Sequence, residues 1–156
     1  MKLFHGSTVE IEYIDLALSK PNKDFGRAFY LSTDEQQALE LAKFRAEFED
    51  SEPIVNVFEF DESLFHQFHC KRFEAYTVEW AHFVYDHRTE PQGRTLHDYD
   101  IVYGPIANDR IGAQITRFKQ GYITFDEFLR RIQYIKGITF QYAFCTQRAV
   151  DKLTKQ

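Results

Sequence analysis

Two short segments near the N-terminus combine polar side chains with apolar surroundings in a way that suits ligand binding. His5 ends an apolar stretch, and Gly6 after it lets a ligand approach the backbone closely. Tyr30 lies within the apolar run 28–31, directly before the start of a predicted helix. Each has a structural explanation too, because His5 can cap a turn and Tyr30 can be a core ring with a bonded hydroxyl. The residue types alone therefore mark candidate site residues and leave the ligand open.

A second cluster has the side chains that transition metals prefer. His66, His69 and Cys70 lie within five residues, and a fourth ligand such as His82 or His97 would have to come from elsewhere. A Cys–His nucleophilic pair is also available there, but no neighbouring group would activate the thiol. Histidines are common on protein surfaces, so we expect no metal.

The segment around Gly121 resembles the second half of a calcium-binding loop, with glycine at position six and Glu127 at position twelve. Calcium also needs oxygen ligands at positions one, three and five. Those positions hold Thr116, Phe118 and Gln120. None is a carboxylate, so calcium binding is excluded, and Glu127 is better explained as the capping-box partner of Thr124.

Length and composition indicate what kind of protein carries these residues. The chain has 156 residues, which predicts a single domain over 1–156, and its 16 Phe and 9 Tyr favour pleated sheet over a helical bundle. Residues 1–78 hold 8 basic and 15 acidic side chains, whereas 79–156 hold 11 and 9, within a net charge of −5. This balance argues against a general polyanion binder and leaves room for one mildly basic face.

Several classes of protein are excluded. Two cysteines cannot build a disulfide scaffold. The N-terminus lacks the apolar run of a secretory signal, and no stretch approaches the roughly 20 apolar residues of a membrane helix. We expect a soluble, cytoplasmic protein with reduced thiols and no membrane partner.

The elements that must position the candidate residues follow from periodicity and capping patterns. We predict strands at 2–5, 28–31, 54–60 and 100–104, and a β-prone aromatic segment at 137–145. We predict helices from a Thr33 cap to about Phe48, over 78–88, from a Thr124 cap to about Ile135, and after Thr146. Trp80, Phe83 and Val84 should face inward. The first helix should bury the apolar face formed by Ala38, Leu41, Ala42 and Phe48. Strands and helices do not alternate strictly, so the fold class is α+β.

Taken together, the two N-terminal segments resemble motifs of a known superfamily. Phe4-His5-Gly6-Ser7 is similar to the first motif of the diphtheria-toxin-like ADP-ribosyltransferases, which include the poly(ADP-ribose) polymerases. The segment from Gly26 to Thr33, followed by helical 34–42, is similar to their second motif. Over nearly its full length the chain resembles a bacterial family of small proteins in that superfamily, catalogued as a domain of unknown function. The loop 21–26, the segments 98–105 and 109–110, and residues 139–153 also carry this likeness.

The resemblance implies a role for each matching residue. His5 would bind the adenosine-side ribose of NAD, the Gly6 backbone would bond the nicotinamide amide, and Ser7 would lie beside them. Tyr30 would stack on the nicotinamide ring, on the strand that begins near Gly26. Asn22, Asp24 and Arg27 would line the cleft or contact its phosphates, Arg27 because its planar guanidinium matches phosphate oxygens.

The third motif departs from the superfamily, which usually has a glutamate on a late strand. Gln141 stands at that position. Glutamine can bond a ribose hydroxyl but supplies no negative charge, which disfavours poly-ADP-ribose elongation. Slow mono-transfer, a different acid such as Asp24 or Asp109, and an inactive NAD-binding module remain open.

The resemblance thus implies two small antiparallel sheets that form an NAD cleft flanked by helices. The expected activity is NAD-dependent mono-ADP-ribosyl transfer to a macromolecular acceptor, protein or nucleic acid, with NAD as co-substrate and no metal. The catalytic residues would be His5, Tyr30 and Gln141. Small bacterial members of the superfamily often act as toxins or in phage defence, which also allows an inhibitory partner protein. A non-catalytic NAD or ADP-ribose binding module is the alternative.

Overall fold

Seven short strands, most of them rich in β-branched and aromatic residues, form one sheet. The computed structural model describes residues 1–134 and 137–156, and the strand order in it is β4-β5-β6-β2-β1-β3-β7. The strands are β1 (Lys2–Ser7), β2 (Phe29–Ser32), β3 (Ile54–Glu59), β4 (Cys70–Arg72), β5 (Ile101–Pro105), β6 (Phe140–Phe144) and β7 (Thr154–Lys155). The α+β class predicted from the sequence is confirmed.

The sheet arrangement differs from the expectation of two separate antiparallel sheets. One continuous sheet is present, and it is mixed because β4 and β5 run parallel. A parallel pair needs a long crossover, and helix α2 (Val78–Thr89) provides it. Strands β1 and β2 pair over a much shorter length than β1 and β3. Strand β2 pairs with β1 through Phe4 opposite Ser32, whereas β1 and β3 pair from end to end.

Alternating side chains place two apolar clusters on opposite faces of the sheet. On β2, Phe29 and Leu31 join one cluster, whereas Tyr30 packs against the other. The first cluster also holds Phe58, Phe60 and Phe144, and the second holds Trp80, Val84 and Phe128. The predicted inward orientation of Trp80 and Val84 is therefore confirmed, and Phe83 is half-buried and packs against the second cluster. The opposite directions of Phe29 and Tyr30 follow from the two-residue period of a strand.

Helix α1 (Glu35–Glu49) corrects two predictions. Its N-cap is Asp34, whose side chain accepts from the Gln37 amide, and not Thr33. It buries the stripe formed by Ala38, Ala42 and Ala46, whereas Leu41 and Phe48 are 38% and 80% exposed. Small side chains are required because α1 lies so close to β1 that larger ones would not fit.

The remaining helices are α3 (Ile111–Lys119), α4 (Phe125–Arg131) and α5 (Gln147–Val150), with 3-10 turns η1 (Leu16–Leu18) and η2 (Glu62–Gln67). The Thr124 and Thr146 caps are confirmed. Helix α4 ends at Arg131 with Ile132 as its C-cap, earlier than predicted, and the predicted last residue, Ile135, lies outside the described residues. The sequence analysis missed α3, which has no side-chain N-cap, and the short β4 and β7.

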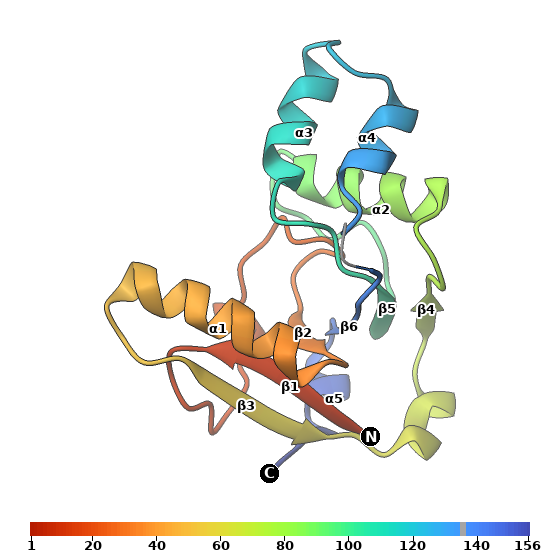
Figure 1. Ribbon diagram of the computed structural model, residues 1–156. Coiled ribbons are helices and arrows are strands. Elements are labelled where there is room, and N and C mark those ends of the chain that lie inside the picture. The colour runs from red at the N-terminus through yellow and green to blue at the C-terminus, as the bar shows by residue number, and fades with distance from the viewer. Residues whose placement is uncertain (135–136) are drawn as a thin grey trace.

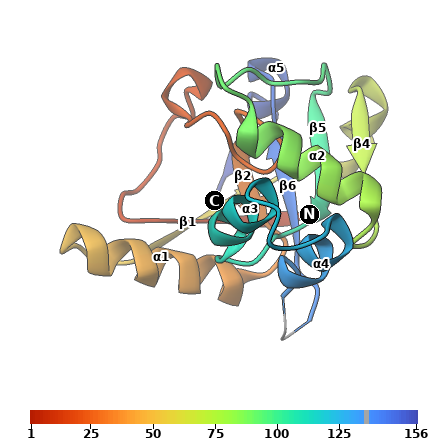
Figure 2. The same ribbon diagram turned by 90° about the horizontal axis from the view of Figure 1, so that it is seen from above.

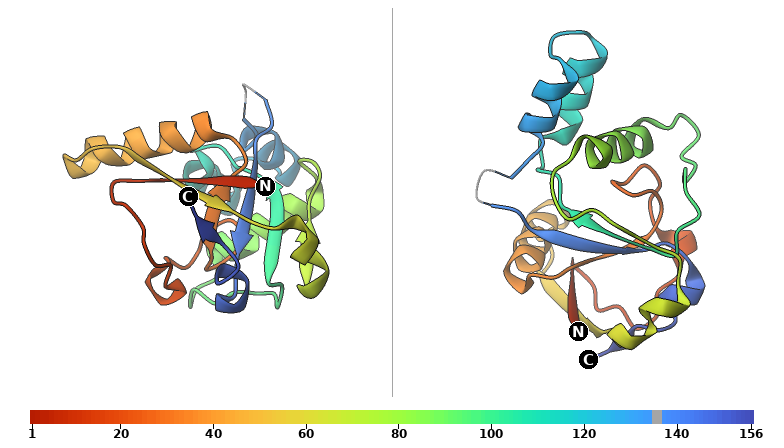
Figure 3. Two further views of the ribbon diagram at one scale, coloured as in Figure 1. Left: turned by 90° about the horizontal axis from the view of Figure 1, so that it is seen from below. Right: turned by 90° about the vertical axis from the view of Figure 1, so that its right-hand side faces the viewer.

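Helices α2, α3 and α4 gather at one end of the molecule, on the face of the second cluster (Figure 1). Seen from above, α1 lies apart from them, along β1 (Figure 2). The α3–α4 hairpin projects away from the sheet (Figure 3, right). Among the described residues, no helix combines the length and the apolar character needed to span a membrane.

Candidate functional site

His5 lies near the end of β1, where its ring is held by β2. The ring stacks on Phe29 with centroids 4.5 Å apart, and Nδ1 lies 2.7 Å from the Tyr30 carbonyl oxygen. A carbonyl only accepts, so Nδ1 carries the proton and Nε2 of the neutral ring is an acceptor. Burial lowers the pKa of His5 to about 4, partly offset by the bond to Tyr30. The site therefore has a neutral histidine at pH 7 that can accept a hydrogen bond from a ligand hydroxyl.

Gly6 is required by helix packing. A Cβ at this position would lie 2.1 Å from the Ala38 carbonyl oxygen and 2.9 Å from the Ala42 nitrogen, both in the α1 backbone. The Gly6 carbonyl accepts from the Arg45 guanidinium of α1 at 2.8 Å. Ser7 is buried, and its Oγ accepts from the Val9 amide at 3.2 Å. These two residues thus hold α1 and the strand end in place beside His5.

Tyr30 closes the loop that leads into β2. Its hydroxyl donates to the Gly26 carbonyl at 2.7 Å and accepts from the Phe25 amide at 2.9 Å. Burial, together with the nearby Asp24 carboxylate, raises the pKa of Tyr30 well above its ordinary value. The hydroxyl therefore stays protonated and orients the ring, which leaves any binding role to the ring itself.

Gln141 and Asp24 form a buried polar pair beneath the same loop. Gln141 Nε2 donates to Asp24 Oδ2 at 3.1 Å. Asp24 Oδ1 accepts from Arg88 Nε at 2.8 Å and Nη2 at 2.6 Å. Both Asp24 and Gln141 are more than nine-tenths buried, so this network is largely desolvated and its bonds are correspondingly strong. A carboxylate thus stands next to the residue that replaces the expected glutamate.

The loop with Asn22, Gly26 and Arg27 is fixed from outside by the segment 90–99. Asn22 Nδ2 donates to the carbonyls of His87 and Glu90, and the Arg27 amide donates to Thr95 Oγ1 at 3.3 Å. Gly26 has φ +88° and lies against the Thr95 side chain, so only glycine suits it well. The Arg27 guanidinium donates to the carbonyls of Ala17 and Ser19.

Two histidines fasten the segment 90–99. His87 Nε2 accepts from the Leu96 amide at 2.9 Å, and its Nδ1 lies 2.8 Å from the Phe83 carbonyl. His97 Nδ1 accepts from the Tyr99 amide at 3.0 Å, and its Nε2 lies 2.8 Å from the Phe25 carbonyl. Each ring is neutral because one nitrogen must accept. Burial, the largest influence, lowers the pKa of both.

The fold therefore brings some of the predicted site residues together. His5 meets the Tyr30 backbone, Tyr30 and Ser32 pair with β6, and Gln141 meets Asp24. Arg27, by contrast, is engaged with the carbonyls of the 17–19 segment. Sequence reasoning missed Arg88, because it lies 64 residues from Asp24 on a helix with no local motif. It also missed Arg45, whose partner is a backbone carbonyl that no side-chain pattern reveals.

Other potential sites lie elsewhere. In the described ranges, no three His, Cys, Asp or Glu side chains gather in a way that could hold a metal ion. A cavity of about 400 Å³ lies at the tip of the α3–α4 hairpin, and one of about 230 Å³ lies between η2 and the β4–β5 edge. Neither is lined by the predicted site residues.

A family model described as "Protein of unknown function (DUF3990)" matches residues 1–154. The chain belongs to the DUF3990 family. No curated protein and no solved structure matches it. The DUF3990 description states no activity.

Proposed function

We propose that this DUF3990 protein is an NAD-dependent mono-ADP-ribosyltransferase that binds NAD around the junction of β1, β2 and β6. The carrying observation is the hydrogen bond between His5 Nδ1 and the Tyr30 carbonyl, because it joins the two sequence motifs on which the proposal depends. The same strand, β2, pairs with the strand of Gln141. Three segments distant in sequence thus contribute to one region.

The properties of His5 suit the ribose-binding role. Its Nε2 is an acceptor at neutral pH, and within the part of the chain that the structure describes it has no hydrogen-bond partner. A ribose hydroxyl is the natural donor to such a nitrogen. The narrow pairing of β1 with β2 also supports an NAD cleft, since strands joined through Phe4 and Ser32 can diverge on either side. The split-sheet arrangement of the superfamily is part of this proposal.

The proposed reaction breaks the bond between the nicotinamide nitrogen and C1′ of the ribose. Nicotinamide leaves with the electron pair, the acceptor nucleophile bonds to C1′, and its proton passes to solvent. Positive charge develops on the ribose during this step, and a nearby anion stabilises it. We propose that Gln141 bonds the ribose hydroxyl and that Asp24, 3.1 Å from its amide, supplies the charge. Because Arg88 partly compensates Asp24, the expected transfer is slow and stops at one ADP-ribose.

The two free cysteines fit a reducing compartment such as the cytoplasm, where we propose that the reaction takes place. The acceptor is a macromolecule, and a toxin or defence role with an inhibitory partner stays part of the proposal.

A non-catalytic NAD or ADP-ribose binding module is the second candidate. One observation favours it: the Asp24 carboxylate is bonded to both Gln141 and Arg88, so its charge is already compensated within the protein. In that case His5 and Tyr30 would bind the dinucleotide without cleaving it.

The test uses the purified chain, adenine-labelled NAD and a cell lysate as the source of acceptors. Released nicotinamide and labelled macromolecule are measured for the wild type and for Tyr30→Ala, Gln141→Ala and Asp24→Asn. Tyr13→Ala is the matched control, because Tyr13 is 75% exposed and forms none of the contacts described for His5, Tyr30, Asp24 and Gln141. Tyr30→Phe separates the ring from the hydroxyl.

Transfer that is lost in Tyr30→Ala and Gln141→Ala but kept in Tyr30→Phe and Tyr13→Ala supports the enzyme. Saturable NAD binding without nicotinamide release supports the binding module. Absence of both binding and release in the folded wild type would refute both proposals.

A further inference from the structure

The α3–α4 hairpin is a basic projection on an acidic protein. Residues 1–108 contain 10 basic and 20 acidic side chains, whereas the 25 residues 109–133 contain five basic and three acidic ones. The hairpin stands clear of the sheet in the side view (Figure 3, right). An anionic partner would be repelled by most of the molecule and attracted to this end of it.

Aromatic packing joins the hairpin to α2. Phe118 and Phe128 have ring centroids 5.9 Å apart, and both pack edge-on against Tyr85 of α2. Phe125 stacks on His82 of α2 at 4.0 Å. The hairpin is thus fixed to α2 from one side, and side chains at its tip are held on a stable frame.

The turn at the tip fixes Tyr122 beside Arg117. The Tyr122 amide donates to the Arg117 carbonyl at 3.0 Å, and the Gly121 amide donates to the Phe118 carbonyl at 3.0 Å. With Gly121 at φ +78°, this is the Schellman arrangement that ends many helices. It leaves Tyr122 76% exposed, so its ring faces solvent. The backbone hydrogen bond to Arg117 keeps Tyr122 close to that residue.

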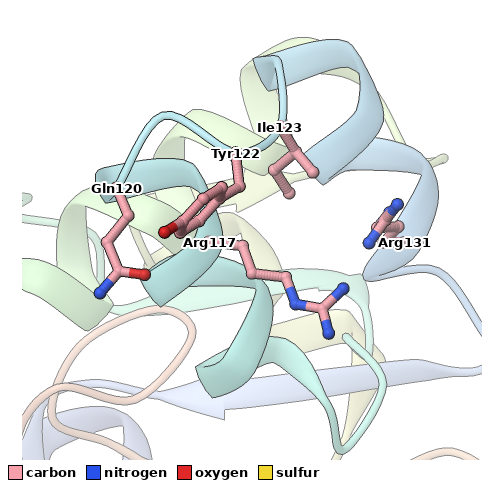
Figure 4. Close-up of a pocket in the computed structure, with 5 residues that line it drawn as sticks. All are labelled: Arg117, Gln120, Tyr122, Ile123 and Arg131. Atoms are coloured by element: carbon pink, nitrogen blue, oxygen red, sulfur yellow. The ribbon is translucent and has the colours of Figure 1, made fainter.

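The cavity of about 400 Å³ at this tip is lined by Arg117, Gln120, Tyr122, Ile123 and Arg131. Figure 4 shows the Arg117 side chain extending from α3 toward the side where Arg131 lies, with the Tyr122 ring at the other end beside Gln120. Two guanidinium groups from different helices therefore share one cavity.

The charges of these two arginines are only partly compensated. Arg131 donates through Nε to Glu127 at 2.8 Å, and Glu127 also accepts from Arg130. Within 1–134 and 137–156, no carboxylate forms an ion pair with Arg117. Guanidinium groups with spare N–H donors match the oxygens of a phosphate.

We propose that this tip is a second binding site, for a nucleotide unit: Arg117 and Arg131 hold its phosphate, and Tyr122 stacks on its base. The unit is either a free nucleotide or part of a single-stranded nucleic acid, which share this chemistry. An acidic peptide offers carboxylates but no flat ring for Tyr122, so it is the less suitable ligand. The site is independent of the proposed NAD site and stands if the transferase proposal fails.

The experiment measures fluorescence anisotropy of labelled single-stranded RNA and DNA of roughly 12 nucleotides, a common site size. Unlabelled AMP and a poly-glutamate peptide serve as competitors. Arg117→Gln and Arg131→Gln should each raise Kd by about tenfold or more, since a bond to a charged group is lost. Tyr122→Ala should raise it by about tenfold, the scale of one base–aromatic stack, and Tyr122→Phe should leave it nearly unchanged.

Lys43→Gln is the matched control, because it removes one positive charge from exposed α1 and should change Kd by less than about twofold. If AMP competes with the oligonucleotide, and the variants that weaken oligonucleotide binding also weaken AMP binding, a free nucleotide is sufficient as the ligand. If the oligonucleotide binds and AMP does not compete, the ligand is a single-stranded nucleic acid. Thermal melting of each variant verifies folding, and Arg117→Gln carries the test if Arg131→Gln unfolds.

Three outcomes overturn the proposal. The wild type fails to bind any of the nucleotide probes, or Arg117→Gln binds as well as the wild type, or poly-glutamate displaces the labelled oligonucleotides better than AMP does.

Discussion

Replacing Arg88 by methionine should destabilise the fold by leaving the Asp24 carboxylate buried with one neutral donor. Arg88 donates two bonds to Asp24 Oδ1, and the Asp24 side chain is 8% exposed. Breaking a buried ion pair from one side typically costs about 3–5 kcal/mol. Since Arg88 itself is 29% exposed and solvent screens part of the pair, we expect about 2–3 kcal/mol. For a chain of this size that corresponds to a fall in Tm of roughly 4–12 °C.

The assay is urea unfolding of a double-mutant cycle with Asp24→Asn, which removes the charge but keeps a polar group that Gln141 can contact. Adding Asp24→Asn to Arg88→Met should recover stability, so the coupling free energy should be at least about 1 kcal/mol. Arg130→Met is the control, because Arg130 belongs to a pair at the surface and should change stability by about 0.5 kcal/mol or less. Additivity of Arg88→Met and Asp24→Asn within about 0.3 kcal/mol would refute the assigned network.

Three further predictions concern Gly6, the three histidines with lowered pKa values, and Phe48. Gly6→Ala should cost roughly 3 kcal/mol or more, measured by urea unfolding, because its Cβ would overlap an α1 carbonyl at 2.1 Å; wild-type stability would contradict this packing. Acid should destabilise the protein. His5, His87 and His97 have lowered pKa values, so the unfolded chain binds protons first and stability falls as pH drops below about 6.5. His5 alone, with its pKa of about 4, accounts for about 2 kcal/mol between pH 8 and pH 5, so His5→Phe should flatten the profile of urea midpoint against pH. Phe48→Gln should change Tm by less than about 2 °C, because the ring is 80% exposed; a larger fall would mean that this face of α1 is covered.

Local patterns were sufficient for most of the elements. The Thr124 and Thr146 caps, the alternating strand β3 and the helix α2 all depend on neighbours within a few residues, and the structure confirms them. The predicted inward face of α1 was right for Ala38 and Ala42 and wrong for Leu41 and Phe48, which were included because they are large and hydrophobic. The packing against Gly6 instead selected alanines, and that distance of approach is a tertiary quantity.

For the candidate site too, some features could be predicted from the sequence and others could not. The types of His5, Tyr30 and Gln141 and their order along the chain are visible in the sequence. Their partners are not, since Arg88 lies far along the chain from Asp24 and the acceptors for Arg45 and Arg27 are backbone carbonyls. Every residue has a backbone carbonyl acceptor, so the sequence does not indicate which carbonyl accepts the hydrogen bond.

By itself, the sequence determined the α+β class, the aromatic core material and the candidate residues, because these depend on composition and short-range periodicity. Only the tertiary structure decided that the strands join in one mixed sheet, that Asp24 lies against Gln141, and that Arg117 and Arg131 share a cavity. Each of these depends on which distant segments pack together. Distant segments pack together so that apolar area is buried over the whole chain. No local stretch of residues therefore determines which segments meet.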